Sequence, residues 1–308
     1  MDTKLFDDWN VQLAKTYTPG MIKPDTWFTI TQKINGVRAT SFNDHLVSRT
    51  GHDILGCNDI LNDLLELERV LGKRYCFDGE LRLKPLYSVN MTDNEVFKMS
   101  VGIVNAQRNM GEKYKLQFII FDIIPLKQFA FEQPTDNYSE RLKLLLDVKL
   151  LISKLCLSSL SVVPIFYSGT DISMIETLAV KATNAGMEGI MINLDSKYQY
   201  KRTGEILKYK KFNTIDLRVI GVTEGTGKYE GTLGALVCKY KDNLVSVGSG
   251  FTDAQRNNIW ANIDKVVDTI IEVKYKDITS DVSTGLESLQ FPVFLGFRSK
   301  IDKITEDA

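Results

Sequence analysis

The feature that most constrains the fold is a change of pattern near Asn213. Before this residue, apolar segments with strand character alternate with segments of helical spacing, and after it short apolar segments follow one another between glycine-rich turns. No linker rich in Pro, Gly or Ser and no internal repeat lies between the two regions. A chain of 308 residues is long enough to form two hydrophobic cores. We therefore expect two domains, residues 1–212 and residues 213–308.

The second region has the pattern of a small antiparallel barrel. Helical character is expected in one stretch, Thr252 to Ile263, and strands are expected at Leu217 to Thr223, Gly234 to Tyr240, Leu244 to Gly248 and Thr269 to Tyr275. About five short strands and one helix in a segment of this length are typical of the OB-fold.

The first region mixes strands and helices, so that the whole chain is expected to be of the α+β class. Val37–Phe42 and Leu46–Arg49 have the pattern of a hairpin around Asn43-Asp44. Ser139 is expected to cap a helix that runs to Leu151, whose leucines recur at helical spacing. Gly189 to Leu194 is an apolar run typical of a buried strand.

Charge and cysteine content exclude several classes of protein. Lys and Arg number 38 against 39 Asp and Glu, so a nucleic-acid partner would have to meet a local basic surface. No apolar run approaches the roughly 18 residues of a membrane span, and the acidic start is unlike a signal peptide. The 4 cysteines are scattered and only 2 histidines are present, which argues against a zinc site or a disulfide framework. We expect a soluble protein of a reducing compartment, the cytoplasm, without a membrane partner.

Four short segments place charged residues beside glycine turns or at strand ends. In Lys33-Ile34-Asn35-Gly36-Val37-Arg38 a lysine ends an apolar strand, Glu80 follows Asp78-Gly79, and Glu188 precedes an apolar strand. In Leu207–Phe212, Lys208 and Lys210 share one face of a strand because side chains alternate along it. Each segment alone is weak, since solvated lysines and acids are common in hairpin turns. Their order along the chain is specific.

In this order the segments resemble the nucleotidyltransferase motifs of the ATP-dependent DNA ligases, a superfamily shared with RNA ligases and mRNA capping enzymes. The resemblance extends to further segments, Ser48-Arg49-Thr50-Gly51, Phe121-Asp122-Ile123, Gly248–Thr252 leading to Arg256, and Phe291–Arg298. The last two are most similar to the small ligases of phages and large DNA viruses. The resemblance implies a nucleotidyltransferase (adenylation) domain followed by an OB-fold β-barrel.

The resemblance also implies a reaction in three steps. AMP passes from ATP to Lys33 and then from lysyl-AMP to the 5′-phosphate of a nick. In the third step the 3′-hydroxyl attacks that phosphate and AMP is released. A free lysine has a pKa near 10.4, so only about one in two thousand is a neutral nucleophile at pH 7. Neighbouring positive charge favours the neutral amine. Lys208, Lys210 and Mg²⁺, which Mn²⁺ could replace, would supply that charge and neutralise the α-phosphate.

Four further residues would hold the nucleotide and its metal. The resemblance makes Glu188 a metal ligand, and Glu80 either a second metal ligand or an acceptor for the ribose hydroxyls. Phe121 would stack on one face of adenine and Met191 would cover the other. Taken alone, each of these acids could be a surface residue paired with a lysine, and Phe121 could be plain core.

Four arginines would bind phosphates. Arg38 and Arg49 can each grip a phosphate through a planar fork, which suits the 5′-phosphate of the nick. Arg202 is a looser candidate for the same role, and a solvated side chain explains it equally well. Arg298 resembles the family's final motif, which orients the pyrophosphate from the second domain, so that the domains would have to close and reopen.

The sequence departs from the family pattern in three places. Asn35 stands where DNA ligases usually carry Asp, which removes a negative charge expected near the 3′-end of the nick. Gln290 stands where many relatives have a basic residue. Glu224 to Gly234 is a short glycine-rich turn where some viral ligases insert a long loop, so we expect no loop that encircles DNA. Phosphate contacts by scattered lysines would then make binding strongly salt-dependent.

The sequence therefore predicts an ATP-dependent DNA ligase that acts as a monomer on nicked duplex DNA, in DNA repair, replication or recombination. An RNA ligase remains an alternative because of Asn35, and a capping guanylyltransferase would differ by using GTP. A non-catalytic OB-fold binder of nucleic acid is a rival from another class. Such a binder would not need Lys33, Glu80 and Glu188 together.

Overall fold

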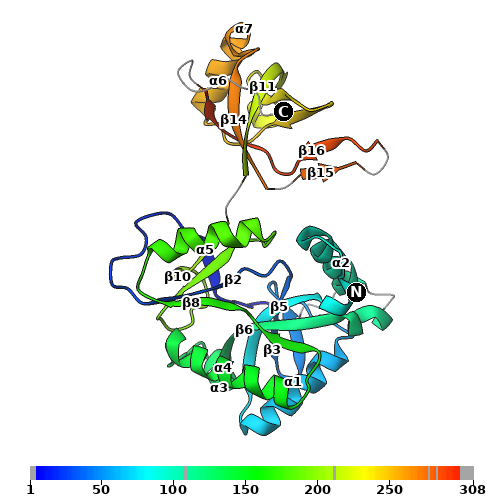
Figure 1. The fold of residues 1–308 in the computed structure, drawn as a ribbon, viewed down its shortest axis with the longest axis vertical. Coiled ribbons are helices and arrows are strands. Elements are labelled where there is room, and N and C mark those ends of the chain that lie inside the picture. The colour runs from blue at the N-terminus through cyan, green and yellow to red at the C-terminus, as the bar shows by residue number, and fades with distance from the viewer. Residues whose placement is uncertain (1–4, 107–109, 211–212, 277, 282–283, 299–308) are drawn as a thin grey trace. The chain divides into compact units, whose positions relative to one another are not determined.

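The chain forms two compact units, Met1–Lys211 and Phe212–Ala308. The structure is a computed structural model, which describes residues 5–298 except 107–109, 211–212, 277 and 282–283 (Figure 1). The domain boundary that we expect adjoins residues 211 and 212, which lie outside the described residues. No helix in the described ranges is long and apolar enough to cross a membrane.

The first unit contains two five-stranded sheets. The first sheet has the order β1-β10-β9-β2-β8 and the second has the order β4-β3-β5-β6-β7. The strands of the first sheet are β1 (Leu13–Thr16), β2 (Phe28–Gln32), β8 (Ile165–Gly169), β9 (Ile190–Leu194) and β10 (Arg202–Tyr209). Those of the second are β3 (Val37–Phe42), β4 (His45–Ser48), β5 (Tyr75–Leu83), β6 (Leu116–Pro125) and β7 (Leu160–Val162). Most pairings are antiparallel, but β1 with β10 and β6 with β7 are parallel.

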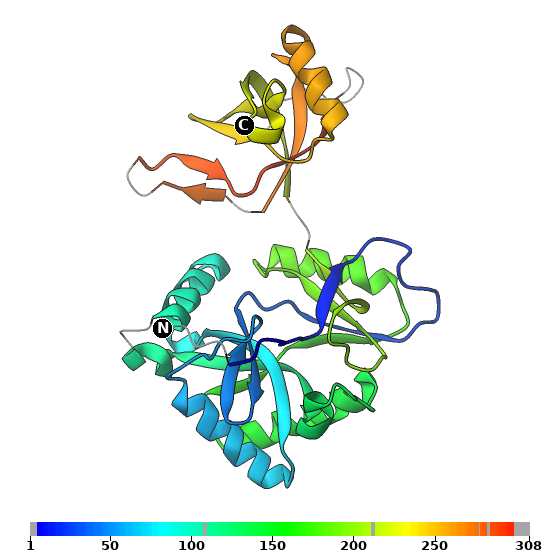
Figure 2. The ribbon, with the colours of Figure 1, turned by 180° about the vertical axis from the view of Figure 1, so that it is seen from behind.

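Helices cover both sheets (Figures 1 and 2). One core lies between the first sheet and α5 (Ser173–Asn184), and a larger core lies between the second sheet and helices that include α1 (Asn58–Leu71) and α4 (Tyr138–Lys154). The remaining helices of this unit are α2 (Asp93–Asn105), α3 (Leu126–Ala130) and the 3₁₀ turns η1 (Pro85–Tyr87) and η2 (Met110–Lys115).

Local sequence signals explain where several elements begin and end. Asn43 and Asp44 both have positive φ, 48° and 64°, as the two-residue turn between β3 and β4 requires. The helix that we expected to be capped by Ser139 begins two residues earlier, with Asn137 as its cap and Tyr138 as its first residue. The reason is Asn137, whose backbone N–H donates to the Glu140 carboxylate at 2.8 Å, so that Asn137 rather than Ser139 is the first residue of the capping box.

The second unit is built on one antiparallel sheet of order β13-β12-β11-β14-β17. Its strands are β11 (Asn213–Glu224), β12 (Leu233–Tyr240), β13 (Asn243–Val247), β14 (Ile270–Tyr275) and β17 (Val293–Phe297). The long strand β11 pairs with β14 through its first half and with β12 through its second half. Helices α6 (Asp253–Ala261) and α7 (Ile263–Val266), the turn η3 (Gly227–Tyr229) and a hairpin of β15 (Ile278–Ser280) and β16 (Glu287–Leu289) complete the unit.

The sheet of the second unit does not close into a complete barrel. Among the described residues, edge strand β17 meets not β13 itself but the segment after it, through a parallel bridge between Ser249 and Val293 in which the Phe294 N–H donates to the Ser249 carbonyl at 2.9 Å. The predicted α+β class, with antiparallel sheets and helices, is confirmed, and the barrel is an open, OB-like one.

Candidate active site

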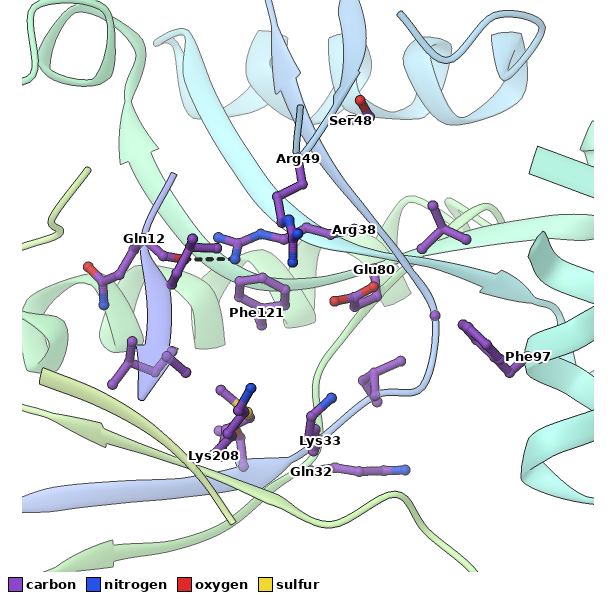
Figure 3. Close-up of a pocket in the computed structure, with 18 of the residues that line it drawn as sticks. Gln12, Gln32, Lys33, Arg38, Ser48, Arg49, Glu80, Phe97, Phe121 and Lys208 are labelled. Carbon is purple, nitrogen blue, oxygen red and sulfur yellow. Dashed lines mark hydrogen bonds between the residues drawn. The ribbon is translucent and has the colours of Figure 1, made fainter. Parts of the chain in front are cut away.

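A cavity of about 570 Å³ lies in the first unit, between residues of its two sheets (Figure 3). It brings together most of the residues that the sequence predicted for the site. Those that line it are Lys33, Arg38, Arg49, Glu80, Phe121, Met191, Arg202, Lys208 and Lys210. Pairing of strands explains some of this convergence, since Arg38 on β3 lies opposite Glu80 on β5, and Lys208 on β10 lies opposite Met191 on β9.

Lys33 directly follows β2, and its side chain points into the cavity (Figure 3). Its backbone N–H donates to the carbonyl of Gly189 at 2.9 Å, which fixes the end of β2 against the start of β9. Its Nζ donates to Glu188 Oε2 at 2.5 Å, and Lys210 Nζ donates to the other carboxylate oxygen. Lys33 is 19% exposed and Glu188 is 8% exposed. One carboxylate therefore binds two ammonium groups at the wall of the cavity.

This arrangement sets the charge of Glu188. Burial alone would raise the pKa of Glu188, but the ammonium groups of Lys33 and Lys210 outweigh burial, and the pKa of Glu188 lies below its ordinary value. Glu188 is therefore an anion at neutral pH. For Lys33 to act as a nucleophile, it must lose a proton and part from this carboxylate.

Glu80 on β5 differs from Glu188 in that its pKa is raised above the ordinary value and not lowered. Burial is the main cause that raises the pKa of Glu80 to about 8, Arg38 and Lys33 lower it, and Asp78 and Glu188 raise it further. Its Oε2 is buried and has no hydrogen-bond partner among the described residues. A Cβ on Gly36 would lie 2.8 Å from the Leu81 carbonyl and 3.0 Å from Glu80 Cβ, so the turn after Lys33 approaches β5 this closely only because residue 36 is glycine.

The guanidinium of Arg38 is bound to buried protein groups, so it is not fully available to bind a phosphate as the sequence predicted. Its Nε and Nη2 donate to the two oxygens of Asp78 at 2.9 and 2.5 Å, and its Nη1 donates to the Gln12 carbonyl at 2.7 Å. The Tyr198 hydroxyl donates to the same carboxylate at 2.7 Å. Burial alone would lower the pKa of Arg38, but Asp78 outweighs it and raises the pKa above its ordinary value. The guanidinium lies 5.2 Å from the ring centre of Phe121.

The other cations of the cavity differ in how they are engaged. Arg202 donates from Nη1 to the Ala14 carbonyl at 2.6 Å. The side chains of Arg49 and Lys208 make no hydrogen bond or ion pair with any residue that the structure describes. These two side chains can therefore bind a negatively charged ligand without giving up a contact to any described residue.

Arg298 belongs to the second unit and does not line this cavity. Its Nε donates to Asp216 Oδ1 at 2.9 Å, and its Nη2 lies 3.2 Å from Glu272 Oε1. These partners lie on β11 and β14 of the same unit.

A comparison with known protein families shows the family to which this chain belongs. The family model described as "ATP dependent DNA ligase domain" matches residues 11–210, well over half of the chain. The chain belongs to the ATP-dependent DNA ligases. A second family model, described as "DNA ligase OB-like domain", matches residues 224–298.

Individual proteins that are similar to this ligase are also named as DNA ligases. A DNA ligase of Haemophilus influenzae is 23% identical over 287 residues, which is 89% of each chain. A DNA ligase of Methanoculleus marisnigri is 30% identical over 212 residues, 62% of this ligase and 36% of that protein. The solved structure "Pmar-Lig_Pre." is 25% identical, with a TM-score of 0.73 over 94% of this ligase and 67% of that chain. A structure from "DNA binding with a minimal scaffold: Structure-function analysis of Lig E DNA ligases" is 21% identical, with a TM-score of 0.67, and has the same fold over 94% of this ligase and 99% of that chain.

The ligase is therefore an enzyme that forms phosphodiester bonds in DNA and uses ATP, and its family works through a lysyl-AMP intermediate. The family matches favour this activity over an RNA ligase, a capping enzyme or a non-catalytic OB-fold binder. The prediction of a small ATP-dependent DNA ligase is confirmed.

Sequence analysis missed residues that hold the ligase's cavity together. Gln12 bonds Arg38 through its carbonyl, accepts from the Gln199 N–H at 2.6 Å through Oε1, and donates from its backbone to the Tyr198 hydroxyl at 3.1 Å. Asp78 could have been found, because it lies two residues before Glu80 on the same strand and therefore on the same face. For Gln12 and Tyr198 the sequence carries no signal, since they are remote in the chain from Arg38.

Proposed function

We propose that the cavity of the first unit is the ATP site and that Lys33 is the residue that becomes adenylated. The single observation that supports this proposal best is the convergence of Lys33, Glu80, Lys208 and Lys210 on one cavity, with Glu188 bound to two of these lysines. Its volume, about 570 Å³, is ordinary for a site that encloses a nucleotide-sized ligand. In domain terms, residues 1–212 would be the nucleotidyltransferase domain and residues 213–308 the OB-like domain.

The first transfer would run as an in-line substitution at the α-phosphorus of ATP. Lys33 Nζ, after losing a proton, forms a bond to phosphorus, and the bond to the bridging oxygen breaks with release of pyrophosphate. Lys208 and Lys210 would neutralise the charge that gathers on the phosphates. The phosphoramidate then passes its AMP to the 5′-phosphate of a nick, and the 3′-hydroxyl displaces AMP to join the strands.

The remaining residues of the site would bind the rest of the substrates. Phe121 and Met191 would enclose adenine, and Arg49, with Arg202, would bind the 5′-phosphate of the nick. The role of Arg38 in this proposal changes, because its three contacts to Asp78 and Gln12 make it a fixed cation beside Phe121. Two of its five N–H groups stay available for a phosphate or a ribose oxygen. Arg298 would orient the pyrophosphate from the second unit.

Mg²⁺, which Mn²⁺ could replace, would be held by Glu80 and Glu188 together with phosphate oxygens and water. Mg²⁺ commonly uses one or two carboxylates and substrate phosphates. No cluster of three or more His, Cys, Asp or Glu that could hold a metal exists in the described part of the chain, which fits an ion that arrives with the nucleotide. The buried, unpartnered Oε2 of Glu80 fits a ligand oxygen. When bound, the ion would supply positive charge to the phosphates.

The partner would be nicked duplex DNA, and the protein would act as a monomer in the cytoplasm. The exposed Arg49, and the ammonium of Lys208, which contacts no acid among the described residues, support a polyanionic substrate at this face of the first unit.

Labelling with α-³²P-ATP and Mg²⁺ tests the assignment of Lys33. The parent should retain label through denaturation and Lys33→Ala should retain none, because no other amine replaces the nucleophile. Lys23→Ala is the matched control, since Lys23 is an exposed lysine of the same region that does not line the cavity. Label on Lys33→Ala at the parental level would rule out the assignment. Sealing of all four DNA and RNA strand combinations at a nick would then establish the substrate.

A further inference from the structure

Asn35 turns away from the cavity that its neighbours form. Lys33, Ile34, Gly36 and Val37 line the cavity, but Asn35 does not. Its side chain is buried, with the residue 7% exposed, and its Nδ2 donates to Asp93 Oδ2 at 2.9 Å. Asp93 is the first residue of α2, a helix that sequence analysis did not predict.

The guanidinium of Arg82 contacts both Asn35 and Asp93, so that these three residues form a closed ring of contacts. Arg82 Nη2 lies 2.8 Å from Asp93 Oδ1, and Arg82 Nη1 donates to the backbone carbonyl of Asn35 at 2.8 Å. Arg82 and Asp93 are only 17% and 19% exposed, so these contacts are shielded from most water. The ring joins three elements: the turn that follows Lys33, strand β5 and the start of α2.

Helix α2 is a firm anchor for that turn. A capping box of Thr92 and Glu95 fixes its first turn, in which the Glu95 carboxylate accepts from the Thr92 N–H at 2.7 Å. A carboxylate at the first helical position is also favoured by the helix dipole. The helix packs on β5 through buried Val96 and Ser100, and the Ser100 hydroxyl accepts from the Leu83 N–H at 2.9 Å.

The charges of the ring explain why residue 35 is an amide. Asp93 supplies one negative charge and Arg82 one positive charge, and Asn35 adds a donor without adding charge. An Asp at position 35 would place two carboxylates within hydrogen-bond distance, where like charges strongly disfavour double ionisation. The amide is thus the side chain that fits opposite Asp93.

We propose that Asp93 is a positioning residue for lysine adenylation, which holds the turn behind Lys33 through Asn35 and Arg82. This inference rests on the proposed function, in which Lys33 is the nucleophile. The nucleophile lies two residues from Asn35, and its backbone is fixed on the other side by Gly189. Loosening the ring leaves Lys33 anchored on one side only, so that its amine samples geometries unsuited to attack. The residues that bind ATP itself do not belong to the ring.

The test is single-turnover adenylation of the full chain at varied ATP concentration. Asp93→Ala and Asn35→Asp should each lower the rate constant at saturating ATP by about tenfold or more, because small misplacements of reacting groups are costly. The half-saturating ATP concentration should stay within about twofold of the parent. The double variant Asn35→Asp/Asp93→Asn exchanges amide and carboxylate and should recover a rate within about threefold of the parent.

Glu95→Ala is the matched control, because it weakens the same helix start without touching Asn35 or Arg82. Because the contacts of Asn35, Arg82 and Asp93 stay in place, it should lower the saturating rate constant far less than Asp93→Ala does. The inference is overturned if the exchanged double variant stays as slow as the single variants, if Glu95→Ala is equally slow, or if the half-saturating ATP concentration alone changes. If Asn35→Asp fails to fold, Asp93→Ala and the double variant still decide the matter. Failure of the proposed function would appear separately, as label on Lys33→Ala.

Discussion

At the scale of single residues, Glu80 is an acid whose surroundings make it hold its proton more tightly than an acid in water does. It is an acid whose pKa is raised to about 8, mainly by burial, and which has one buried oxygen without a hydrogen-bond partner among the described residues. An acid with this pKa is mostly neutral at pH 7, and a nearby cation would favour its ionised form.

Replacing Glu80 by Gln should therefore make the metal-free, nucleotide-free protein more stable at alkaline pH. The folded state keeps the Glu80 proton until the pH passes about 8, whereas the unfolded state loses it near the ordinary value of 4.5. Between these values the folded state binds more protons, so the parent loses stability as pH rises, by about 1.4 kcal/mol for each pH unit over which this linkage acts. Glu80→Gln should not show this slope. Urea unfolding between pH 5 and pH 9 in the presence of a chelator measures it, and parallel slopes for the two proteins would refute the assignment.

Sequence patterns at this scale predicted the members of the cavity but not their partners. Lys33, Glu80, Lys208 and Lys210 were recognisable because the short segments that contain them follow one another in an order that resembles the ATP-dependent DNA ligases. The bonds of Arg38 to Asp78 and Gln12 could not be predicted, since they depend on which strands become neighbours. The same is true of Asn35 and Asp93, which are 58 positions apart in the chain.

At the scale of elements, α4 is attached to β6 by a buried ion pair next to Phe121. Arg141 donates from Nε and Nη2 to the two oxygens of Asp122 at 2.7 and 3.0 Å, and from Nη1 to the Asp136 carbonyl at 2.7 Å. Both residues are buried. The pair holds the strand that presents Phe121 to the cavity.

Arg141→Leu should lower the free energy of unfolding by about 3–5 kcal/mol, because it leaves the Asp122 charge buried without a partner. Asp122→Asn/Arg141→Leu should lose less, since no charge is then stranded. Arg69→Leu, which breaks the exposed pair with Glu66, is the control and should change stability little. Denaturant unfolding followed by circular dichroism compares the three. Equal losses for the single and double variants would show that the charge is not the cause.

Strands and helices could be predicted best where the residues that signal them lie within one short segment of the sequence. The β3–β4 hairpin and the helix α4 follow from turn residues and periodicity within one segment. Helices α1 and α2 were missed, although α2 carries a capping-box signal in Thr92 and Glu95. The hairpin β15–β16 was missed because strands of 3 residues carry almost no periodic signal.

At the scale of the whole molecule, the fold distributes four cysteines unequally between interior and surface. Cys57, Cys76 and Cys238 are buried and Cys156 is exposed. Burial raises the pKa of Cys57 to about 11, that of Cys238 to about 12, and that of Cys76 well above its ordinary range. Thiolates, which are the reactive form, are therefore scarce at the three buried positions.

One thiol should consequently react rapidly with a disulfide reagent at pH 8, and all four should react in denaturant. Because Cys57 and Cys76 belong to the first unit and Cys238 to the second, this count tests the packing of both units at once. Cys156→Ser should remove the rapid phase without changing adenylation. Two or more rapidly reacting thiols in the parent would mean that one of the cores is looser than the structure has it.

The parallel pairing of β1 with β10 joins segments nearly 190 residues apart, Leu13 with Arg202. Gln12 and Ala14 from the early segment, and Lys208 and Lys210 from the late one, face the same cavity. As the chain leaves the ribosome, the β3–β5–β6 sheet can therefore assemble well before the cavity does. A nascent chain stalled anywhere before residue 202 would carry Lys33 without β10, so under the proposed function the growing polypeptide would gain its reactivity toward ATP only near the end of synthesis of this unit.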